Sequence, residues 1–402
     1  MIYLYDLFDF CFKNGKVPSI WTKAVIAPIH KSGKDPYEPL NYRGISLLSC
    51  VGKLYTSVLE KRIVNYCETL NLISDEQNGF RRDRSCCDHI FSLTSIIRNR
   101  LACGEDTYIA LVDMEKAFDW IYRPLLLYRL LENNIDGKIY KAIKSLYTNT
   151  EAYVHINAEV DTDWFSVPSG VRQGDPLSPT LFSIFINSLV ENLKLLDIGI
   201  DIGLSKVCIL LYADDIVLIA KSEGELQTML DTMEHWCKYW QLKVNNAKTN
   251  IMHLRGKRKK PTDFTFKFDG TNLQIVEQYK YLGFWLNEHL NYDVSAERLS
   301  EAGSRALGAI VSKFKLFKNV SYGTFTKLYN ASVVPVIDYA SGVWGFSKAN
   351  CCDKIQNRAL RYFLGVHKFC PVPAMHGDMG YHECKFRRFL NMLRYWNRII
   401  NR

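Results

Sequence analysis

The feature that most limits what this chain can fold into is a pair of adjacent carboxylates between two apolar runs. Residues 212–215 read Tyr-Ala-Asp-Asp and stand between the apolar segments 207–211 and 216–220, where a buried β-hairpin should turn. Burying the ionised carboxylates of Asp214 and Asp215 is costly unless a cation compensates. Carboxylate oxygens are the protein ligands that hard divalent cations prefer. The pattern therefore predicts a divalent-cation site on a hairpin.

Charge is distributed unevenly along the chain. With 402 residues, of which 48% are hydrophobic and 23% charged, the protein can bury more than one core. Residues 1–285 hold 34 Lys and Arg against 34 Asp and Glu, whereas residues 286–402 hold 17 against 8, so the net charge of +9 lies in the last third. Such a basic region favours a nucleic-acid partner, because Lys and Arg release its condensed counterions. A merely solvated basic surface explains the same charge equally well.

The chain lacks the sequence signs of a membrane or secreted protein. No segment reaches the ~18 to 20 uninterrupted apolar residues that a membrane span requires, so no membrane partner is expected. The apolar first eleven residues include Asp6 and Asp9 and no basic leader, which argues against a signal peptide. Adjacent cysteines such as Cys86 and Cys87 are poor disulfide partners, which favours a reducing compartment. We expect an intracellular protein, nuclear or cytoplasmic, without a clear targeting signal.

Hydrophobic periodicity through the middle of the chain indicates an α+β fold. The first 105 residues are expected to be helix-rich, interrupted by a loop at 31–39. The elements expected further along are a strand at 107–113, helices at 115–131 and 181–196, a hairpin at 207–220, a helix at 223–240 and a strand at 249–254. This order is typical of an antiparallel sheet with helices on one face. Such a sheet can bring Asp113 beside Asp214 and Asp215. Three carboxylates at a sheet edge can hold two Mg²⁺ ions for phosphoryl transfer, which is polymerase chemistry.

Seven segments carry a more specific signal when they are taken in order. They are Trp21–Lys34, Asn41–Leu48, Gln77–Arg84, Ala110–Asp119, Ser169–Phe182, Leu211–Ala220 and Tyr279–Leu286. Together they resemble the reverse transcriptase, an RNA-directed DNA polymerase, of non-long-terminal-repeat (LINE-type) retrotransposons. The resemblance covers roughly residues 12–290 and is weaker beyond.

The resemblance implies a right-hand polymerase fold. Fingers are expected at 1–105, with a further part at 120–165, and an antiparallel-sheet palm flanked by helices at 106–286. A basic helical thumb is expected at 287–402. The implied activity is template-dependent addition of deoxynucleotides to a primer 3′-OH. The implied partners are an RNA template, a DNA primer, their hybrid duplex, dNTPs and two Mg²⁺ ions, for which Mn²⁺ can substitute, while the oligomeric state stays open.

Motif positions assign roles in the catalytic centre by resemblance. Asp113 and Asp214 match the metal ligands of the family, and Asp215 is the neighbouring carboxylate. Phe118 matches the aromatic residue that packs under the incoming sugar and rejects a 2′-hydroxyl, although a core Phe on an amphipathic helix would look the same. Lys248 matches a palm lysine that protonates the pyrophosphate leaving group; a solvated surface lysine is the alternative.

Further motif positions are assigned to substrate binding. Gln173 and Gly174 match a loop that contacts the nucleotide and the template strand, with simple turn chemistry as the alternative. Lys31 and Arg43 match cations of the fingers that grip the triphosphate. The hairpin that positions the primer end in the family corresponds here to Tyr281, Leu282 and Gly283, although an aromatic strand in a hydrophobic core would look the same.

Alternatives of another kind remain open at the level of sequence. The upstream endonuclease and the downstream Cys/His knuckle of full-length elements cannot be identified, so we expect a fragment, a truncated copy or a single module. A catalytically inactive nucleic-acid-binding relic would share these motifs. An RNA-dependent RNA polymerase usually carries a polar residue at the place of Phe118. We predict no structural zinc, because the spacing of five residues matches no standard site: His367, Cys370, His376, His382 and Cys384.

Overall fold

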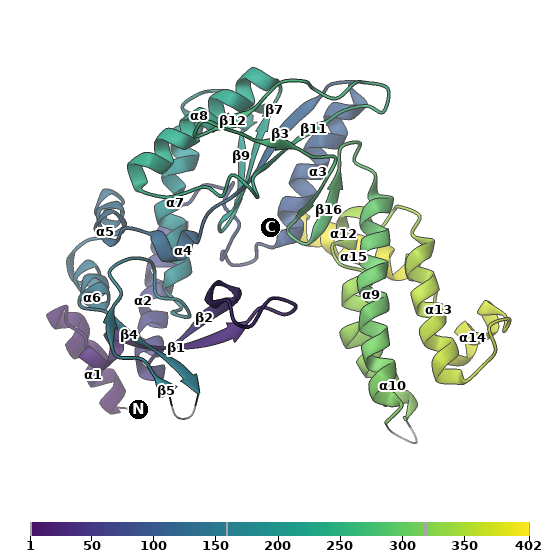
Figure 1. Ribbon diagram of the computed structural model, residues 1–402, viewed down its shortest axis with the longest axis horizontal. Helices are drawn as coiled ribbons and strands as arrows, with labels where there is room; N and C mark the ends of the chain where they lie inside the picture. Colours follow the sequence, from purple (N-terminus) through teal and green to yellow (C-terminus); the bar gives the residue numbers. More distant parts are fainter. Residues whose placement is uncertain (1, 158–159, 317–319, 402) are drawn as a thin grey trace. The chain divides into compact units, whose positions relative to one another are not determined.

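The computed structural model describes residues 2–157, 160–316 and 320–401 of the chain. It divides into two compact units: the first unit comprises residues 1–84, 110–250 and 265–274, and the second unit comprises residues 85–109, 251–264 and 275–402. Helices and strands alternate in the first unit, and helices dominate the second (Figure 1). This mixture confirms the α+β class. The division into three parts at 1–105, 106–286 and 287–402 is a different partition and stays a prediction.

The first unit holds most of the strands. Its elements are α1 (Ile2–Asn14), η1 (Ser19–Thr22), β1 (Lys23–His30), η2 (Pro39–Asn41), β2 (Tyr42–Leu47), α2 (Cys50–Thr69), α4 (Ala117–Trp120), α5 (Arg123–Glu132), α6 (Gly137–Tyr147), β4 (Glu151–Asn157), β5 (Val160–Asp161), β6 (Phe165–Ser166), α7 (Ser178–Lys194), β7 (Ile200–Ile202), β8 (Ser205–Val207), β9 (Ile209–Tyr212), β10 (Asp215–Ala220), α8 (Glu223–Trp240), β12 (Lys267–Phe268) and β13 (Thr271–Asn272). Three strands cross the boundary between the units: β3 (Thr107–Asp113), β11 (Asn250–Leu254) and β14 (Gln274–Ile275).

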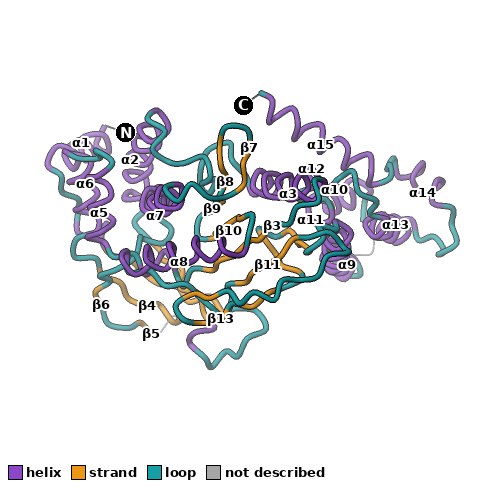
Figure 2. Tube along the Cα trace, turned by 90° about the horizontal axis from the view of Figure 1, so that it is seen from above, coloured by secondary structure: helices purple, strands orange, loops and turns teal. Residues whose placement is uncertain are grey.

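The expected Asp-Asp hairpin forms from β9 and β10, with β3 hydrogen-bonded to the other edge of β10. The pairing is antiparallel and places Ile216 opposite Leu211. The apolar residues of both strands are buried, and α8 packs against β10 (Figure 2). Phe185 of α7 and Trp236 of α8 are fully buried, and their rings meet edge-on. A continuous apolar run on both strands is what a sheet buried on both faces requires. The sequence prediction of this hairpin and of α8 is confirmed.

A second sheet in the first unit lies where the sequence predicted only helices and a loop. β1 pairs with β2 in antiparallel and with β4 in parallel fashion. Residues 31–39, which form the expected loop, connect β1 to η2 and β2. The prediction of a helix-rich start was wrong for β1 and β2, whose half-exposed residues lack the strict alternation that marks a strand in sequence.

The helix expected at 115–131 is also interrupted. Lys116 has a φ of +45°, and the chain forms the short α4 before α5 begins at Arg123. Pro124 lies in the first turn of α5 and cannot continue a helix from the preceding residues, because it lacks an N–H and disfavours the helical conformation before it. The break turns Phe118 into part of a short, separate helix.

Besides its parts of β3, β11 and β14, the described residues of the second unit form helices and one hairpin. Its elements are α3 (Cys86–Ala102), β15 (Gln278–Tyr281), β16 (Phe284–Asn287), α9 (Tyr292–Phe314), α10 (Tyr322–Ser332), α11 (Val334–Ile337), α12 (Ser341–Trp344), α13 (Asn350–Leu364), α14 (Val372–Met379) and α15 (Cys384–Ile400). α9 packs against β16, α11 and α13, and α12 packs against α15. Among the described residues, none of the helices combines the length and the apolarity needed to cross a bilayer.

Candidate active site

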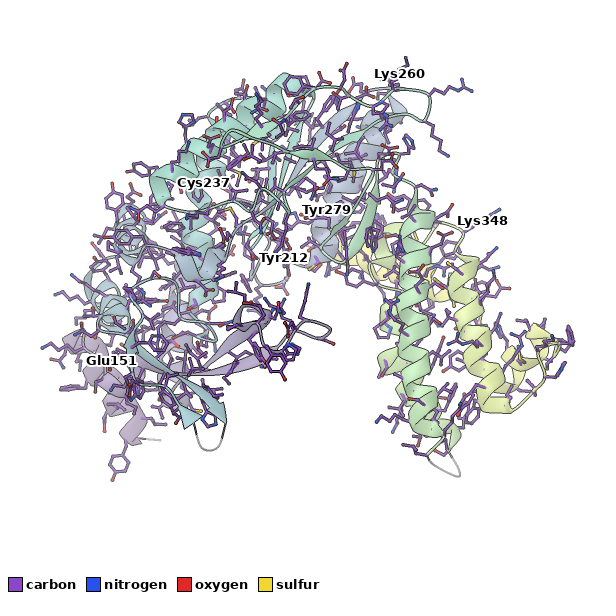
Figure 3. The ribbon with its side chains drawn as sticks, viewed as in Figure 1. Glu151, Tyr212, Cys237, Lys260, Tyr279 and Lys348 are labelled. Carbon is purple, nitrogen blue, oxygen red and sulfur yellow. The ribbon has the colours of Figure 1, made fainter. Side chains whose placement is uncertain are left out.

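β9 and β10 are joined by a two-residue turn made of Ala213 and Asp214. Tyr212, which ends β9 and is labelled in Figure 3, pairs with Asp215, which begins β10. Ala213 has a φ of +60°, the sign that two-residue hairpin turns require at their first central position. The tight turn therefore presents Asp214 and Asp215 next to each other at one end of the hairpin.

The carboxylates of this end influence one another. Burial raises the pKa of Asp214, and the charge of Asp113 at the end of β3 adds to the effect. Burial and the charges of Asp214 and Asp113 raise the pKa of Asp215 to about 6, although its side chain also reaches solvent, which screens part of the repulsion. Asp113 thus lies within electrostatic range of both aspartates, as the sequence predicted.

The segment before β11 brings Lys248 to the same place. The Asp113 N–H donates to Thr249 Oγ1 over 3.3 Å, and the Asn245 N–H donates to the Asp113 carbonyl over 2.8 Å. Lys248 Nζ lies 3.6 Å from Asp113 Oδ2 while its side chain is 69% exposed. An exposed ion pair of this kind is worth little, so the ammonium can leave it for another partner.

These carboxylates are suitable ligands for a metal ion, but they do not form a complete coordination site by themselves. Within residues 2–157, 160–316 and 320–401, no group of three or more His, Cys, Asp and Glu side chains is arranged to hold a metal ion. Mg²⁺ is usually bound by one or two carboxylates together with substrate phosphates and water, rather than by protein ligands alone. The mutual repulsion of Asp113, Asp214 and Asp215 is what a bound cation would relieve. The donor set therefore fits Mg²⁺ bound together with a phosphate substrate.

A cavity of about 530 Å³ in the first unit is lined by several of the predicted site residues. Phe118, Gln173, Gly174 and Asp214 all line it. The Phe118 ring stacks on Phe182 with 4.3 Å between ring centroids, so its position in the cavity is set by packing. Residues from three separate segments of the sequence thus line one cavity.

The loop before α7 is bonded to the segment that carries Phe118. The Gly170 N–H donates to the Ile121 carbonyl and the Val171 N–H to the Phe118 carbonyl, each over 2.8 Å. Gly170 has a φ of +78°, and a Cβ there would lie 2.7 Å from the Asp119 carbonyl oxygen, so only glycine allows this approach. Gln173 lines both this cavity and a second one of about 380 Å³, which Ile26 of β1 also lines.

Lys31 and Arg43 lie apart from both cavities. Lys31 Nζ donates to the Leu40 carbonyl over 2.8 Å, and Arg43 is exposed on β2 opposite Ile29. Neither residue lines the cavity that contains Phe118 or the one that contains Ile26. Their assignment to triphosphate binding stays a prediction.

Tyr281, Leu282 and Gly283 form the turn region of the β15–β16 hairpin in the second unit. Tyr281 is buried, so its ring belongs to the core. Leu282 and Gly283 have φ values of +46° and +82°, and the Tyr339 hydroxyl donates to the Leu282 carbonyl over 2.6 Å. The predicted hairpin is present, while its role in positioning a primer stays a prediction.

Two of the five C-terminal histidines and cysteines, His376 and Cys384, contact side chains of α13. His376 Nε2 lies 2.8 Å from Asn357 Oδ1, and Cys384 is fully buried beside Gln356. These contacts describe helix packing around α13 and α15.

Four charged residues that line this cavity were not singled out from the sequence: Lys116, Asp119, Arg172 and Asp175. Lys116 and Asp119 flank Phe118, and Arg172 precedes Gln173. Burial raises the pKa of Asp119, while the charge of Lys116 opposes the shift. Arg172 lies 3.4 Å from the buried Asp175. All of these residues lie in segments that carry the family resemblance. Their closeness in sequence to Phe118 and Gln173 could have identified them as residues of the same cavity.

Comparison with known proteins identifies the family. The family described as Reverse transcriptase (RNA-dependent DNA polymerase) matches residues 29–286. The chain is 26% identical to the probable RNA-directed DNA polymerase from transposon BS of Drosophila melanogaster, over 99% of the chain and 44% of that relative. It is 24% identical to the RNA-directed DNA polymerase from mobile element jockey of the same species, over 90% of the chain and 40% of that relative. The chain thus spans less than half of these relatives.

Solved structures agree at the level of the fold. Apo telomerase from Candida tropicalis superimposes with a TM-score of 0.52 at 12% identity, covering 98% of this chain and 66% of that chain. The same telomerase with a fragment of telomeric RNA gives 0.51 at 15% identity, covering 98% of this chain and 60% of that chain. The family match spans well over half of the chain and confirms the resemblance found in the motifs. The chain belongs to the reverse transcriptase (RNA-dependent DNA polymerase) family.

Proposed function

We propose that this chain is the polymerase module of a LINE-type retrotransposon, which adds deoxynucleotides to a primer 3′-OH as directed by an RNA template. The observation that carries the proposal is the cavity of about 530 Å³ that Phe118, Gln173, Gly174 and Asp214 line together. A cavity of this size suits a nucleotide, and it opens beside the carboxylate pair. Family membership and the relatives' names support the same reaction.

Each residue at the carboxylate end has a proposed part in the reaction. Asp113 and Asp214 would hold divalent cations, with Asp215 beside them. Bound Mg²⁺, or Mn²⁺ in its place, would supply a lowered pKa for the primer hydroxyl and neutralisation of phosphate charge. Lys248 would donate a proton to the departing pyrophosphate, since its ammonium lies beside Asp113 and is otherwise exposed.

The cavity residues would bind and select the nucleotide. Phe118, held by its stack on Phe182, would exclude a 2′-hydroxyl by contact with the sugar. Gln173 and Gly174 would contact the base pair formed with the template, because Gln173 faces both cavities. Lys31 and Arg43 would reach the triphosphate only if β1 and β2 carry them toward a bound substrate.

The larger organisation is proposed by the same reasoning. The sheets and helices of the first unit would supply fingers and palm, and the basic helices from residue 287 onward a thumb that holds a hybrid of RNA template and DNA primer. Tyr281, Leu282 and Gly283 would position the primer end. We propose an intracellular site of action, in the nucleus if the product is joined to genomic DNA.

Primer extension by the purified chain tests the proposal. With an RNA template, a DNA primer, dNTPs and Mg²⁺, we expect extension that Asp214→Asn abolishes. Asp197→Asn makes the same chemical change at an exposed turn, where Asp197 pairs with Lys206, and should extend normally. Asp214→Asn that extends as well as the wild type would overturn the assigned site. A folded wild type that binds the hybrid without extending it would identify an inactive relic, and preference for ribonucleotides would identify an RNA polymerase.

A further inference from the structure

The segment 76–80 crosses the outer side of β9 and reaches the carboxylate turn. We propose that Gln77 is a positioning residue, which holds the turn of Asp214 and Asp215 in the geometry that the reaction needs through hydrogen bonds to its backbone. The inference rests on the proposed function, because it concerns how the same site is kept in place. It assigns a structural task to a residue that does not line the cavity containing Phe118.

Backbone pairing aligns this segment with β9. The Leu211 N–H donates to the Glu76 carbonyl over 2.8 Å, and the Asn78 N–H donates to the Leu211 carbonyl over 3.0 Å. Gln77 therefore forms a parallel bridge with Leu211, two residues before the turn begins. The segment acts as a short extra strand on the free edge of the hairpin, so its side chains are placed in register with the turn.

The Gln77 side chain connects the segment to the turn itself. It is fully buried, and its Oε1 accepts from the Ala213 N–H over 3.3 Å and from the Gly79 N–H over 2.9 Å. Because both partners are N–H donors, the group that faces them must be the carbonyl oxygen of the amide. One acceptor thus joins two backbones, and one of them is the residue directly before Asp214.

The amide nitrogen of Gln77 argues against a purely stabilising role. Gln77 Nε2 is buried and makes no hydrogen bond with any residue that the structure describes. An unpaired buried donor costs folding free energy, so an apolar side chain of equal size would be favoured if stability alone were served. Gln77 lowers the stability of the fold through its unpaired nitrogen, while its oxygen accepts the hydrogen bond that holds the turn.

Gly79 brings the two backbones into contact. A Cβ at Gly79 would lie 2.3 Å from the Ala213 nitrogen and 3.0 Å from the Tyr212 carbonyl carbon. The φ of Gly79 lies outside the left-handed region, so alanine could adopt the backbone conformation and only the close approach forbids it. The segment therefore holds the turn in two ways, by a hydrogen bond from Ala213 to Gln77 and by direct packing of Gly79.

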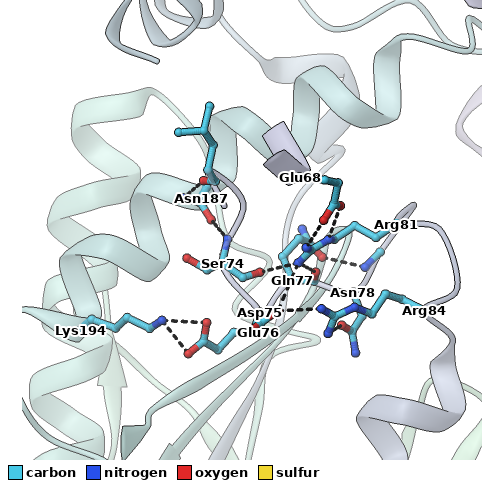
Figure 4. Close-up of polar contacts among 12 residues, drawn as sticks. Glu68, Ser74, Asp75, Glu76, Gln77, Asn78, Arg81, Arg84, Asn187 and Lys194 are labelled. Carbon is cyan, nitrogen blue, oxygen red and sulfur yellow. Dashed lines mark hydrogen bonds and ion pairs between the residues drawn. The ribbon is translucent and has the colours of Figure 1, made fainter. Parts of the chain in front are cut away.

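Ion pairs fix the segment to the rest of the first unit (Figure 4). Arg81 donates to the carbonyls of Ser74 and Gln77 over 3.0 and 3.2 Å, and it pairs in bidentate fashion with Glu68 over 2.9 and 2.7 Å. Its side chain is only 8% exposed, which makes this a rigid anchor. Asn187 of α7 accepts from the Ser74 N–H over 2.8 Å and so holds the chain just before the segment 76–80.

The segment also reaches the residue proposed to select the sugar. Phe80 follows Gly79 with a φ of +61°, and its ring meets the Phe118 ring edge-on with 6.1 Å between centroids. The same five residues therefore contact the carboxylate turn at one point and Phe118 at another. A shift of the segment would disturb both parts of the proposed site.

Replacing Gln77 by methionine tests the hydrogen bond at nearly constant side-chain size. For Gln77→Met we expect faster hydrogen–deuterium exchange in peptides that cover residues 209–216 and weaker Mn²⁺ binding by calorimetry. We also expect kcat for primer extension to fall about a hundredfold with little change in the KM for dNTP, as a displacement of about 1 Å at a reacting centre can cause. Asn187→Leu is the matched control: it removes a buried amide of α7 that accepts from Ser74, just before the segment, and should leave turn exchange, Mn²⁺ affinity and kcat near wild type.

Gly79→Ala keeps the test valid if the methionine variant does not fold. We expect the added Cβ to move the turn and to produce the same losses in Mn²⁺ affinity and kcat. Gly224→Ala adds the same methyl group where nothing lies within 4 Å and should have no such effect.

The outcomes separate the inference from the function on which it rests. An active wild type together with Gln77→Met and Gly79→Ala variants that bind Mn²⁺ and turn over like their controls would overturn the positioning role and leave the proposed function standing. An inactive wild type would count against the proposed function alone. In that case faster exchange at residues 209–216 in Gln77→Met, but not in Asn187→Leu, would still support the positioning role, and equal exchange would overturn it.

Discussion

Asp215 is subject to two opposing demands. A raised pKa means that the folded protein disfavours the charged form, while metal binding needs that form. Below about pH 6 the carboxyl is increasingly protonated, so cation affinity and primer extension should both decline as the pH is lowered through this value. Without a cation, the same charge destabilises the fold.

Thermal unfolding of Asp215→Asn in the absence of divalent cations tests this balance. In the folded protein the pKa of Asp215 is about 6, above its ordinary value of 3.8. Between these two pH values the folded state binds more protons than the unfolded state, so its stability falls as the pH rises. The penalty is full above about pH 6 and absent below about pH 4. We therefore expect Asp215→Asn to raise Tm at pH 7 by an amount that shrinks toward pH 4. Equal Tm values for wild type and variant at pH 7 would contradict the raised pKa.

Phe118 offers a test of substrate choice at the level of one side chain. Trimming it to valine or alanine should admit a 2′-hydroxyl and raise the ratio of ribonucleotide to deoxynucleotide incorporation by about 10- to 200-fold, the range that small changes in a binding pocket produce. Single-nucleotide incorporation kinetics measure this ratio. Phe182→Leu removes the ring on which Phe118 stacks and serves as the comparison, since it should loosen Phe118 without opening the space beside the sugar. An unchanged ratio in Phe118→Ala would show that the ring does not contact the sugar.

At the scale of single elements, strong periodicity was a reliable guide and weak periodicity was not. The apolar runs on either side of residues 212–215 predicted β9 and β10, and the pattern at 223–240 predicted α8 with its bounds. β1 and β2 were missed because their residues are only partly buried, so pairing with β4 rather than local sequence makes them strands. The helix at 115–131 failed at Lys116, whose positive φ no periodicity can reveal.

The candidate site was predictable only where a motif carried it. Asp113, Asp214, Phe118 and Gln173 followed from segments in a recognisable order. Gln77 stood inside such a segment too, yet its task depends on a hydrogen bond to Ala213, 136 residues away, which only the fold reveals. Burial of a polar side chain beside a backbone donor leaves no trace in local sequence.

The β15–β16 hairpin permits a prediction about one element. Gly283 has a φ of +82°, and a Cβ there would lie 3.2 Å from the Tyr339 ring, so Gly283→Ala should lower the free energy of unfolding by about 1–2 kcal/mol through left-handed backbone strain. Gly308→Ala, in α9 with nothing within 4 Å, should instead raise it by up to about 1 kcal/mol. Urea titration measures both values. If the hairpin positions the primer, Gly283→Ala should also raise the KM for primer.

At the scale of the whole molecule, the positive charge of residues 286–402 should make the proposed binding of a hybrid duplex sensitive to salt. Lys348, labelled in Figure 3, and Lys354 on α13 are both exposed. Replacing them by glutamine should reduce the slope of log K against log salt for a hybrid duplex by about 0.9 for each lysine that contacts a phosphate. Fluorescence anisotropy between 50 and 200 mM salt measures the slope. Lys16 is an exposed lysine in the loop after α1, and the control variant Lys16→Gln should leave the slope unchanged.

The division of the chain into two units has a consequence for how such a protein can change over evolutionary time. Each unit is assembled from three separate stretches of chain, so the backbone passes from one unit to the other five times, at residues 84, 109, 250, 264 and 274. No single cut in the gene separates them, and neither can be exchanged by recombination as an intact block. A new module can therefore be joined outside the two units more readily than between them.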